Sequence, residues 1–362
     1  MPGAAVNVLI DGSVLEGGGQ LVRNAVTLAA LLQKPITIQN IRAHRDPPGL
    51  KAQHATGLKL VADICNGELT GCELGSSTVH FRPGPIRSGS FLADARTAGA
   101  TTLLLQIAYP CLVFGPAPSS LVLRGGTHAA HAPPADYTAH VFLPFVRAHL
   151  HRGVQLAVRR HGFFPRGGGE LCVDTEPTPA GPLPAVTLTA RGALVAVHGK
   201  AYVAGHPEAQ AQTIRDGAHA RLVAAGVDPA IISIAAIREE ATNAVGKGAG
   251  IVLWAETDEG CRLGGSSVGA RRWDPASLGE AAADELLRNI EHGGCVDEYL
   301  QDQIILFLAL AEGRSTVRTG PLNLHTKTAM YIAEQLAGAT FSVQEEADGT
   351  VLLSCEGIGF SV

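Results

Sequence analysis

The sequence lacks the paired cysteines of a disulfide scaffold or a zinc finger. Its seven cysteines are scattered, odd in number, and include no C-x-x-C pair. Disulfide frameworks use even sets of cysteines, and structural zinc sites use short paired spacings. We therefore expect reduced thiols, a cytoplasmic setting and no zinc site, with Cys261 as a buried structural thiol.

No uninterrupted apolar run approaches the length of a membrane span, and the first residues, MPGAAVNVLIDGS, lack the charged start of a signal peptide. We therefore expect no membrane association. Positive charge is not in excess either, because the net charge is −5 at pH 7. Proteins that wrap a long nucleic acid are usually basic, so any nucleic-acid ligand should be held only by a short end.

The chain does contain an internal repeat of roughly eighty residues. Three segments share the order helix, strand, loop, helix, strand, strand, and a leading strand is expected before each. We expect helices at 20–32, 55–65, 98–109, 137–151, 298–311 and 329–337. Strands are expected at 35–41, 69–74, 78–82, 120–124, 154–159, 169–175, 315–319, 339–344 and 350–355. Such α/β units place a layer of helices on a sheet.

The repeat is interrupted between its second and third units. The segment PTPAGPLP at 177–184 has the composition of a linker. Strands follow within 186–201 and at 231–237 and 250–256, with a helix at 207–225 and a turn-rich GCRLGGSSVG at 260–269. We therefore predict two domains: residues 1–184 with 279–362, and an inserted small α/β domain at 185–278.

One histidine lies where the chemistry is expected. His325 falls between the strand at 315–319 and the helix at 329–337, and Thr326 or Thr328 could cap that helix. A helix N-terminus attracts phosphate and lowers the pKa of a nearby imidazole, and a nucleophilic histidine must be neutral. On this stretch alone, the simpler interpretation is that His325 completes the turn.

Two glycine runs could bring the backbone close to a ligand. In EGGGQLVR at 16–23, the glycines open a helix, Arg23 could contact a phosphate, and Glu16 could hold a divalent metal. A tight turn is the simpler interpretation of this run taken alone. The second run, HGFFPRGGGEL at 161–171, is typical of a bulged hairpin.

Equivalent loops of repeated units tend to face one another. The first unit's loop carries Arg42, Arg45 and Gln53, the second carries an apolar and aromatic set, and the third carries His325. These loops could line one cleft. His44, His54, His128 and His131 lack the helical spacing of a zinc motif, and we interpret them as polar loop residues.

Taken together, these motifs resemble the RNA 3′-terminal phosphate cyclase family over essentially the whole chain. The H-G-x-x-P-x-G-G-G-x-L stretch at 161–171 looks like the family signature. The remaining matches are E-G-G-G-Q-x-x-R at 16–23, the R-x-x-R…P-G-L-x-x-Q loop at 42–53, G-G-T…A-P-P-A-D-Y at 125–137, D-E-Y-L-x-D-Q at 297–303 and L-H-T-x-T-A at 324–329.

This resemblance implies a fold and an activity. The fold would be α/β, with three βαβαββ units like the C-terminal domain of translation initiation factor three and an inserted thioredoxin-like domain. The activity would be ATP-dependent conversion of an RNA 3′-phosphate to a 2′,3′-cyclic phosphate. In that scheme His325 takes AMP, passes it to the RNA 3′-phosphate, and the neighbouring 2′-OH then expels it.

The resemblance also implies site residues and partners. Adenine would lie between Pro133 and Tyr299. The ATP-binding set would be Gln106, Pro133, Tyr137, Tyr299, Asp302 and Gln303. Polar phosphate-site positions would be Arg23, Arg42, Arg45 and Gln53, and Glu16 would contact Mg²⁺ or Mn²⁺. The partners would be ATP and an RNA 3′-phosphate end, and a homodimer is compatible with the sequence.

Two other functions fit part of the sequence. A non-catalytic branch of the same family acts in ribosomal RNA processing as a binding protein and lacks the nucleophilic histidine. His325 is present here, which favours the catalytic branch. Enolpyruvyl-transfer enzymes also repeat βαβαββ units, but only the repeat supports that alternative.

Overall fold

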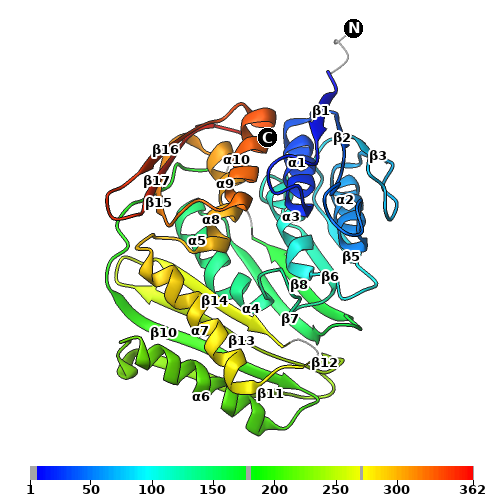
Figure 1. Cartoon of the computed structure of the whole chain (residues 1–362). Coiled ribbons are helices and arrows are strands. Elements are labelled where there is room, and N and C mark those ends of the chain that lie inside the picture. Colours follow the sequence, from blue (N-terminus) through cyan, green and yellow to red (C-terminus); the bar gives the residue numbers. More distant parts are fainter. Residues whose placement is uncertain (1–5, 177–180, 270–271, 362) are drawn as a thin grey trace.

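The computed structural model describes residues 6–176, 181–269 and 272–361. The linker expected at 177–184 lies partly outside these residues, as do residues 1–5 of the N-terminus. Mixed α/β structure fills the described chain, in four sheets with helices packed between and against them (Figure 1). In the part that is described, no helix combines the length and apolar character needed to cross a bilayer.

The first sheet has the order β1-β2-β4-β3. Its strands β1 and β2 are parallel, and β4 pairs antiparallel with both β2 and β3. The elements are β1 (Val8–Asp11), α1 (Gly19–Leu32), β2 (Ile36–Gln39), α2 (Ala52–Cys65), β3 (Glu68–Thr70) and β4 (Val79–Arg82).

The second sheet has the order β12-β7-β8-β6-β5, and its outermost strand β12 comes from the inserted segment. The helix expected at 137–151 consists of three pieces, with a π-helix at Thr138–Phe142 between two α-helices. The elements are β5 (Ser90–Asp94), α3 (Thr101–Val113), β6 (Ser120–Gly125), α4 (Ala135–Tyr137), α5 (Leu143–Leu150), β7 (Val154–Gly162) and β8 (Gly169–Thr175).

The third sheet has the order β16-β17-β15-β9 and is built from distant parts of the chain. The helix expected at 298–311 is broken at Ile304 into α8 and α9. The elements are β9 (Thr187–Leu188), α8 (Glu298–Gln303), α9 (Ile305–Leu310), β15 (Glu312–Thr319), α10 (Leu324–Ala337), β16 (Thr340–Glu345) and β17 (Val351–Ile358).

The inserted segment forms its own sheet, β11-β10-β13-β14, with α6 and α7 packed against it and against each other. The stretch 260–269, expected to be turn-rich, is mostly strand β14. The elements are β10 (Leu194–Ala204), α6 (Glu208–Ala224), a 3₁₀ turn at Pro229–Ile231, β11 (Ile232–Glu239), β12 (Ala244–Val245), β13 (Gly248–Thr257), β14 (Arg262–Val268) and α7 (Pro275–Glu291).

The insert boundaries differ from the expected 185 and 278. Thr187 and Leu188 of β9 pair with β15, so they belong to the third sheet. Leu278 and Leu286 of α7 lie in the core of the insert, because α7 presents its apolar face to that sheet. The insert therefore begins after β9 and includes α7. One larger core joins the other three sheets through α1, which packs against α2, α3 and α10.

Candidate active site

His325 lies in the first turn of α10. The cap of this helix is Asn323, whose side chain accepts the backbone N–H of Thr326 at 2.8 Å. The expected caps, Thr326 and Thr328, were therefore wrong, and so was the helix start at 329. Asn323 is an effective cap because its amide oxygen reaches the free N–H groups of the first turn. His325 is thereby presented at the positive end of the helix, as an exposed residue.

The His325 ring is held from the first helix of the chain. Its Nδ1 lies 3.0 Å from Oε1 of Gln20, which is 305 residues away in the sequence. Because an amide oxygen only accepts, this pairing places the hydrogen on Nδ1 and leaves the lone pair on Nε2. The pKa of His325 is lowered from its ordinary value, chiefly by loss of water around the packed side of the ring. Arg23 and Arg45 lower this pKa as well, and Glu16 opposes them.

Glu16 stands beside this histidine, in the turn before α1. Its backbone N–H donates to Thr328 Oγ1 at 3.2 Å, which ties the glycine run to α10. Its carboxylate Oε1 is paired with the guanidinium of Arg45. The other oxygen, Oε2, is buried and has no hydrogen-bond partner among the described residues. A buried carboxylate oxygen without a donor suits a hard divalent cation.

Arg23 and His54 lie behind the glycine run. A Cβ on Gly19 would come within 2.2 Å of His54 Nε2, so the start of α1 passes close to the imidazole. Burial lowers the pKa of His54 to about 3, with Arg23 contributing. His54 is therefore a buried, neutral side chain in the first turn of α2. Its interpretation as a polar loop residue was therefore wrong, whereas His128 lies in a loop as expected but is buried.

Arg42 and Gln53 are engaged within the protein. The Arg42 guanidinium donates to the carbonyls of Pro47 at 3.0 Å and Gly49 at 2.7 Å. The Gln53 side chain accepts the N–H of Ala100 at 3.1 Å, next to the start of α3. Of the loop residues that were expected to bind phosphate, Arg45 is the one that the structure brings to Glu16 and His325.

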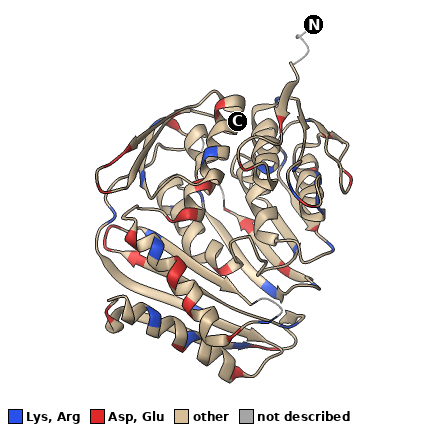
Figure 2. Cartoon of the chain, in the orientation of Figure 1, with Lys and Arg blue, Asp and Glu red and all other residues tan. Residues whose placement is uncertain are grey.

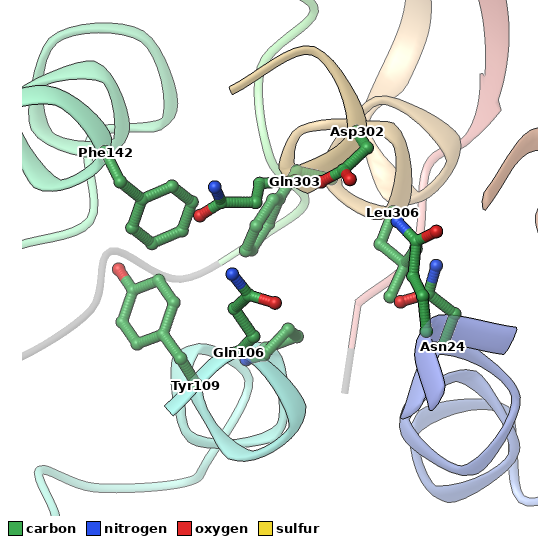
Figure 3. A pocket seen from close by; sticks show the side chains of 10 residues that line it. Asn24, Gln106, Tyr109, Phe142, Asp302, Gln303 and Leu306 are labelled. Carbon is green, nitrogen blue, oxygen red and sulfur yellow. The ribbon is translucent and has the colours of Figure 1, made fainter. Parts of the chain in front are cut away.

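A second cluster of polar side chains lines a small cavity where helices that accompany the first, second and third sheets meet (Figure 3). Gln106 is the position in α3 that is not buried. With Asp302 and Gln303 it faces Asn24 and Gln20 of α1 across a cavity of about 20 Å³, room for about one water molecule. Burial raises the pKa of Asp302 to about 7, although Arg23 lowers it.

Tyr137, Tyr299 and Pro133 lie outside the lining of this cavity. Tyr137 is fully buried, donates its hydroxyl to Asp297 Oδ1 at 2.7 Å, and packs edge-on against Tyr299 with ring centroids 5.5 Å apart. Asp297 also accepts backbone N–H groups from Tyr299 at 2.9 Å and Gly264 at 2.7 Å. This buried carboxylate thus joins α8 to strand β14 of the insert.

Sequence reasoning missed Gln20, His54, Asn24 and Asp297 as members of these clusters. Gln20 directly follows a glycine run that opens a helix, which is a signal for a side chain near a ligand. Asp297 stands before α8 as its N-cap, with its side chain on the first N–H groups, and that local signal was available. Nothing local marks His54 or Asn24.

Comparison with known proteins now decides the family. The family model described as RNA 3′-terminal phosphate cyclase matches residues 14–343. The chain belongs to this family. Relatives in the RNA 3′-terminal phosphate cyclase family include the protein of that name from Drosophila melanogaster, 40% identical over 97% of this chain and 96% of the relative. The one from Pyrobaculum aerophilum is 38% identical over 98% of this chain and 99% of the relative.

A third relative, named a probable RNA 3′-terminal phosphate cyclase, comes from Dictyostelium discoideum and is 36% identical over 97% of this chain and 83% of its own length. Among solved structures, the enolpyruvyl transferase NikO from Streptomyces tendae matches with a TM-score of 0.25 and 17% identity. It covers 48% of this chain and 33% of its own, values too low to carry an argument. The chain is thus a member of an enzyme family, the RNA 3′-terminal phosphate cyclases.

The stretch that looks like the signature of the RNA 3′-terminal phosphate cyclase family lies away from His325, in the hairpin of β7 and β8. The hairpin predicted at 161–171 is confirmed, because β7 and β8 pair antiparallel on either side of the turn at 163–168. The bulge lies just before this stretch, where the strand register shifts between Val158 and Arg160. Gly162 and Gly169 face each other so closely that a Cβ on Gly162 would come within 2.2 Å of the Gly169 nitrogen. These glycines therefore serve close backbone packing.

Proposed function

We propose that this chain uses ATP to convert the 3′-terminal phosphate of RNA into a 2′,3′-cyclic phosphate, with His325 as the nucleophile. The observation that carries the proposal is the pairing of His325 Nδ1 with Gln20, which leaves Nε2 free on an exposed, neutral ring. A neutral imidazole beside arginines, at a helix N-terminus, suits attack on a phosphate.

The reaction would proceed in three displacements. Nε2 of His325 attacks the α-phosphorus of ATP, and pyrophosphate leaves, giving a phosphoramidate. An oxygen of the RNA 3′-phosphate then attacks the AMP phosphorus and releases the histidine, giving RNA(3′)pp(5′)A. Finally the ribose 2′-OH attacks the 3′-phosphorus, loses its proton and expels AMP. Covalent catalysis divides a difficult step, and the 2′-OH is already adjacent on the same ribose.

The chain's charged residues have distinct parts in this scheme. Arg45, whose side chain is 46% exposed, can leave Glu16 for a phosphate group. Glu16 would hold Mg²⁺ or Mn²⁺ through its unpaired Oε2. Such a cation, when bound, neutralises charge on phosphate oxygens. Arg23 balances the carboxylates of Glu16 and Asp302 behind the nucleophile.

For the adenine of ATP, we propose the neighbourhood of Gln106, Asp302 and Gln303, with Tyr299 and Pro133 as the stacking faces that the family resemblance implies. Gln20 joins this region to His325, since it lines the cavity and pairs with the ring. The cavity of about 20 Å³ is too small for a base, so adenine would have to displace side chains there. Tyr299 lies outside the cavity lining and is only half-buried, so its ring could move to stack on the base.

We also infer the finer description of the fold. The orders β1-β2-β4-β3, β5-β6-β8-β7 and β9-β15-β17-β16 follow one plan by position in each unit, which supports three βαβαββ units. In the insert, the order β11-β10-β13-β14 with α6 and α7 supports a thioredoxin-like arrangement.

Labelled ATP tests the proposal directly. Incubation with [α-³²P]ATP should label the wild-type protein with AMP through an acid-labile bond, and His325→Ala should remain folded but unlabelled. A 3′-phosphorylated oligoribonucleotide should then acquire a phosphatase-resistant end. If the protein binds RNA but neither labels itself nor protects the end, the non-catalytic binding function is the correct one. Labelling of His325→Ala at the wild-type yield would refute the role of His325.

A further inference from the structure

A second, larger cleft lies where the β7–β8 hairpin meets the insert. Its volume is about 700 Å³. The hairpin contributes Phe163, Phe164 and Pro165, and the insert contributes Lys247 and Trp273. None of these residues belongs to the active site proposed above.

The aromatic rings of this cleft are held by close backbone contacts. A Cβ on Gly248 would lie 2.2 Å from the Phe163 ring, and one on Gly269 would lie 3.1 Å from the Trp273 indole. Trp273 also packs edge-on against His206, with centroids 5.5 Å apart. Phe164 is 79% exposed. The cleft therefore offers a free phenyl face on one wall and a supported indole on the other.

The charged side chain that lines this cleft is positive. Among the described residues that line it, none is acidic, and Lys247 is exposed at its edge. Arg166 directly follows Pro165, Arg272 directly precedes Trp273, and both are exposed. This local excess of cations contrasts with the net charge of −5 and with the mixture of signs along the rest of the chain (Figure 2). Aromatic faces beside cations suit single-stranded nucleic acid.

The cleft connects to the active site through a short series of contacts. Gly167, at the end of the hairpin turn, packs so tightly against Thr97 that a Cβ would lie 2.2 Å from its carbonyl oxygen. The segment 97–100 contacts Gln53, and the next residue, His54, contacts Gly19 at the start of α1. A continuous series of residue contacts therefore runs from the cleft to the start of α1, which lies beside the proposed nucleophile.

We propose that this cleft binds unpaired bases of the RNA strand that leads to the reacting 3′ end, by stacking on Phe164 and Trp273. The cations Lys247, Arg166 and Arg272 attract the intervening phosphates. The proposal rests on the proposed function for the identity of the strand. Stacking tolerates any base, so the cleft would favour longer unpaired ends over short ones without selecting a sequence.

Tryptophan fluorescence provides the first test. The chain has two tryptophans, and in Trp254→Phe the emission comes from Trp273 alone. Titration with an unlabelled single-stranded oligoribonucleotide about twelve nucleotides long should quench this emission, while ATP should not. The same titration with a dye-labelled oligonucleotide, followed by anisotropy, reports binding independently of catalysis. Saturated anisotropy with unchanged Trp273 emission would place the RNA elsewhere and overturn the proposal.

Substrate length provides the second test. Phe164→Ala should raise the KM for a 3′-phosphorylated twelve-mer about fivefold to a hundredfold, and leave the KM for a dinucleotide and the rate of self-labelling with AMP unchanged. Val343→Ala, an exposed apolar residue on β16, is the matched control. An equal effect on both lengths, or none, would refute the cleft as an RNA site. If no cyclisation occurs in the wild type, the proposed function fails, and anisotropy of Phe164→Ala still decides the cleft.

Discussion

In the proposed mechanism, Gln20 determines which nitrogen of His325 is free to react. If it acts by orienting the ring, Gln20→Ala should keep the fold but slow AMP transfer to His325 about fivefold, from the loss of one hydrogen bond worth about 1 kcal/mol. Gln33→Ala is the control, because Gln33 caps the other end of the same helix and its side chain bonds the carbonyls of Ala30 and Gly84 rather than His325. The measurement is the single-turnover rate of self-labelling at saturating ATP. Equal rates for both variants would show that Gln20 has no positioning role.

The charge of Arg45 should be visible in the pH dependence of self-labelling. The folded pKa of His325 lies below 6.5, so the neutral, reactive ring persists as the pH falls through that value. Arg45→Ala removes a charge that lowers this pKa and frees the Glu16 carboxylate that raises it. Both changes raise the pKa of His325. The acidic limb of the pH–rate profile for self-labelling should therefore move to higher pH.

Arg45→Lys keeps the charge and should leave that limb in place, but lacks the planar fork for phosphate. Transfer of AMP from preformed enzyme–AMP to RNA separates the two roles of this arginine. We expect Arg45→Lys to transfer more slowly than the wild type. If it transfers at the wild-type rate but forms the adduct slowly, Arg45 serves ATP rather than the RNA phosphate.

Individual site residues were predictable only where the local sequence carried a signal. Glu16 and Arg23 flank a glycine run, and His325 precedes a helical pattern. The inward turn of Arg42 was not predictable, because it depends on a left-handed backbone at that residue, with φ of 53°, and on carbonyls of its own loop. The partnership of His325 with Gln20 requires knowledge of which helices become neighbours.

Among the elements, the start of α10 matters most for the proposed chemistry. Asn323→Ala should cost about 1 kcal/mol of unfolding free energy through loss of the cap, and should also slow self-labelling because it loosens the turn that carries His325. Asp274→Ala is the matched control, since Asp274 caps α7 of the insert in the same way. It should lose similar stability but no labelling rate. Chemical denaturation and single-turnover labelling give both quantities. Equal labelling rates in the two variants would contradict this role of the cap.

Helices and strands were largely predictable from periodicity, and the failures have local causes. The stretch 260–269 suggested turns because it is rich in glycine. In the structure these glycines are strand residues on which other elements pack closely: a Cβ on Gly264 would lie 2.5 Å from Tyr137, and one on Gly265 would lie 2.6 Å from the Ala282 carbonyl. Glycine that permits close approach and glycine that permits a turn are identical in a sequence.

At the scale of the whole molecule, a partly buried ion pair joins the insert to the second unit. Lys200 of β10 lies 2.8 Å from Asp136, which also faces His128 at 3.4 Å. Burial opposes the charge on this carboxylate, but His128 and Lys200 hold the pKa of Asp136 well below its usual range. The pair therefore links the two parts of the chain at neutral pH.

Lys200→Met should lower the unfolding free energy by about 2 kcal/mol at pH 7. This loss is smaller than for a fully buried pair, because the lysine is one-third exposed and water screens its charge. The exposed pair of Arg221 and Asp284 is the control, and Arg221→Met should cost less than about 1 kcal/mol. Because the pKa of Asp136 is depressed in the folded protein, the ion pair contributes to the unfolding free energy above about pH 4. This contribution is lost as the pH falls further. A difference between Lys200→Met and the wild type that persists unchanged in acid would contradict the ion pair.

The pairing of Thr187 with Thr316 means that the third sheet cannot close until the chain has passed through the whole insert. Loop closure becomes costlier with length, and a folded insert shortens the span that must be closed. Folding should therefore proceed from the N-terminus, with the third sheet last. His325 meets Gln20 only at that step. Under the proposed function, a nascent chain therefore could not label itself with AMP before its third sheet has formed.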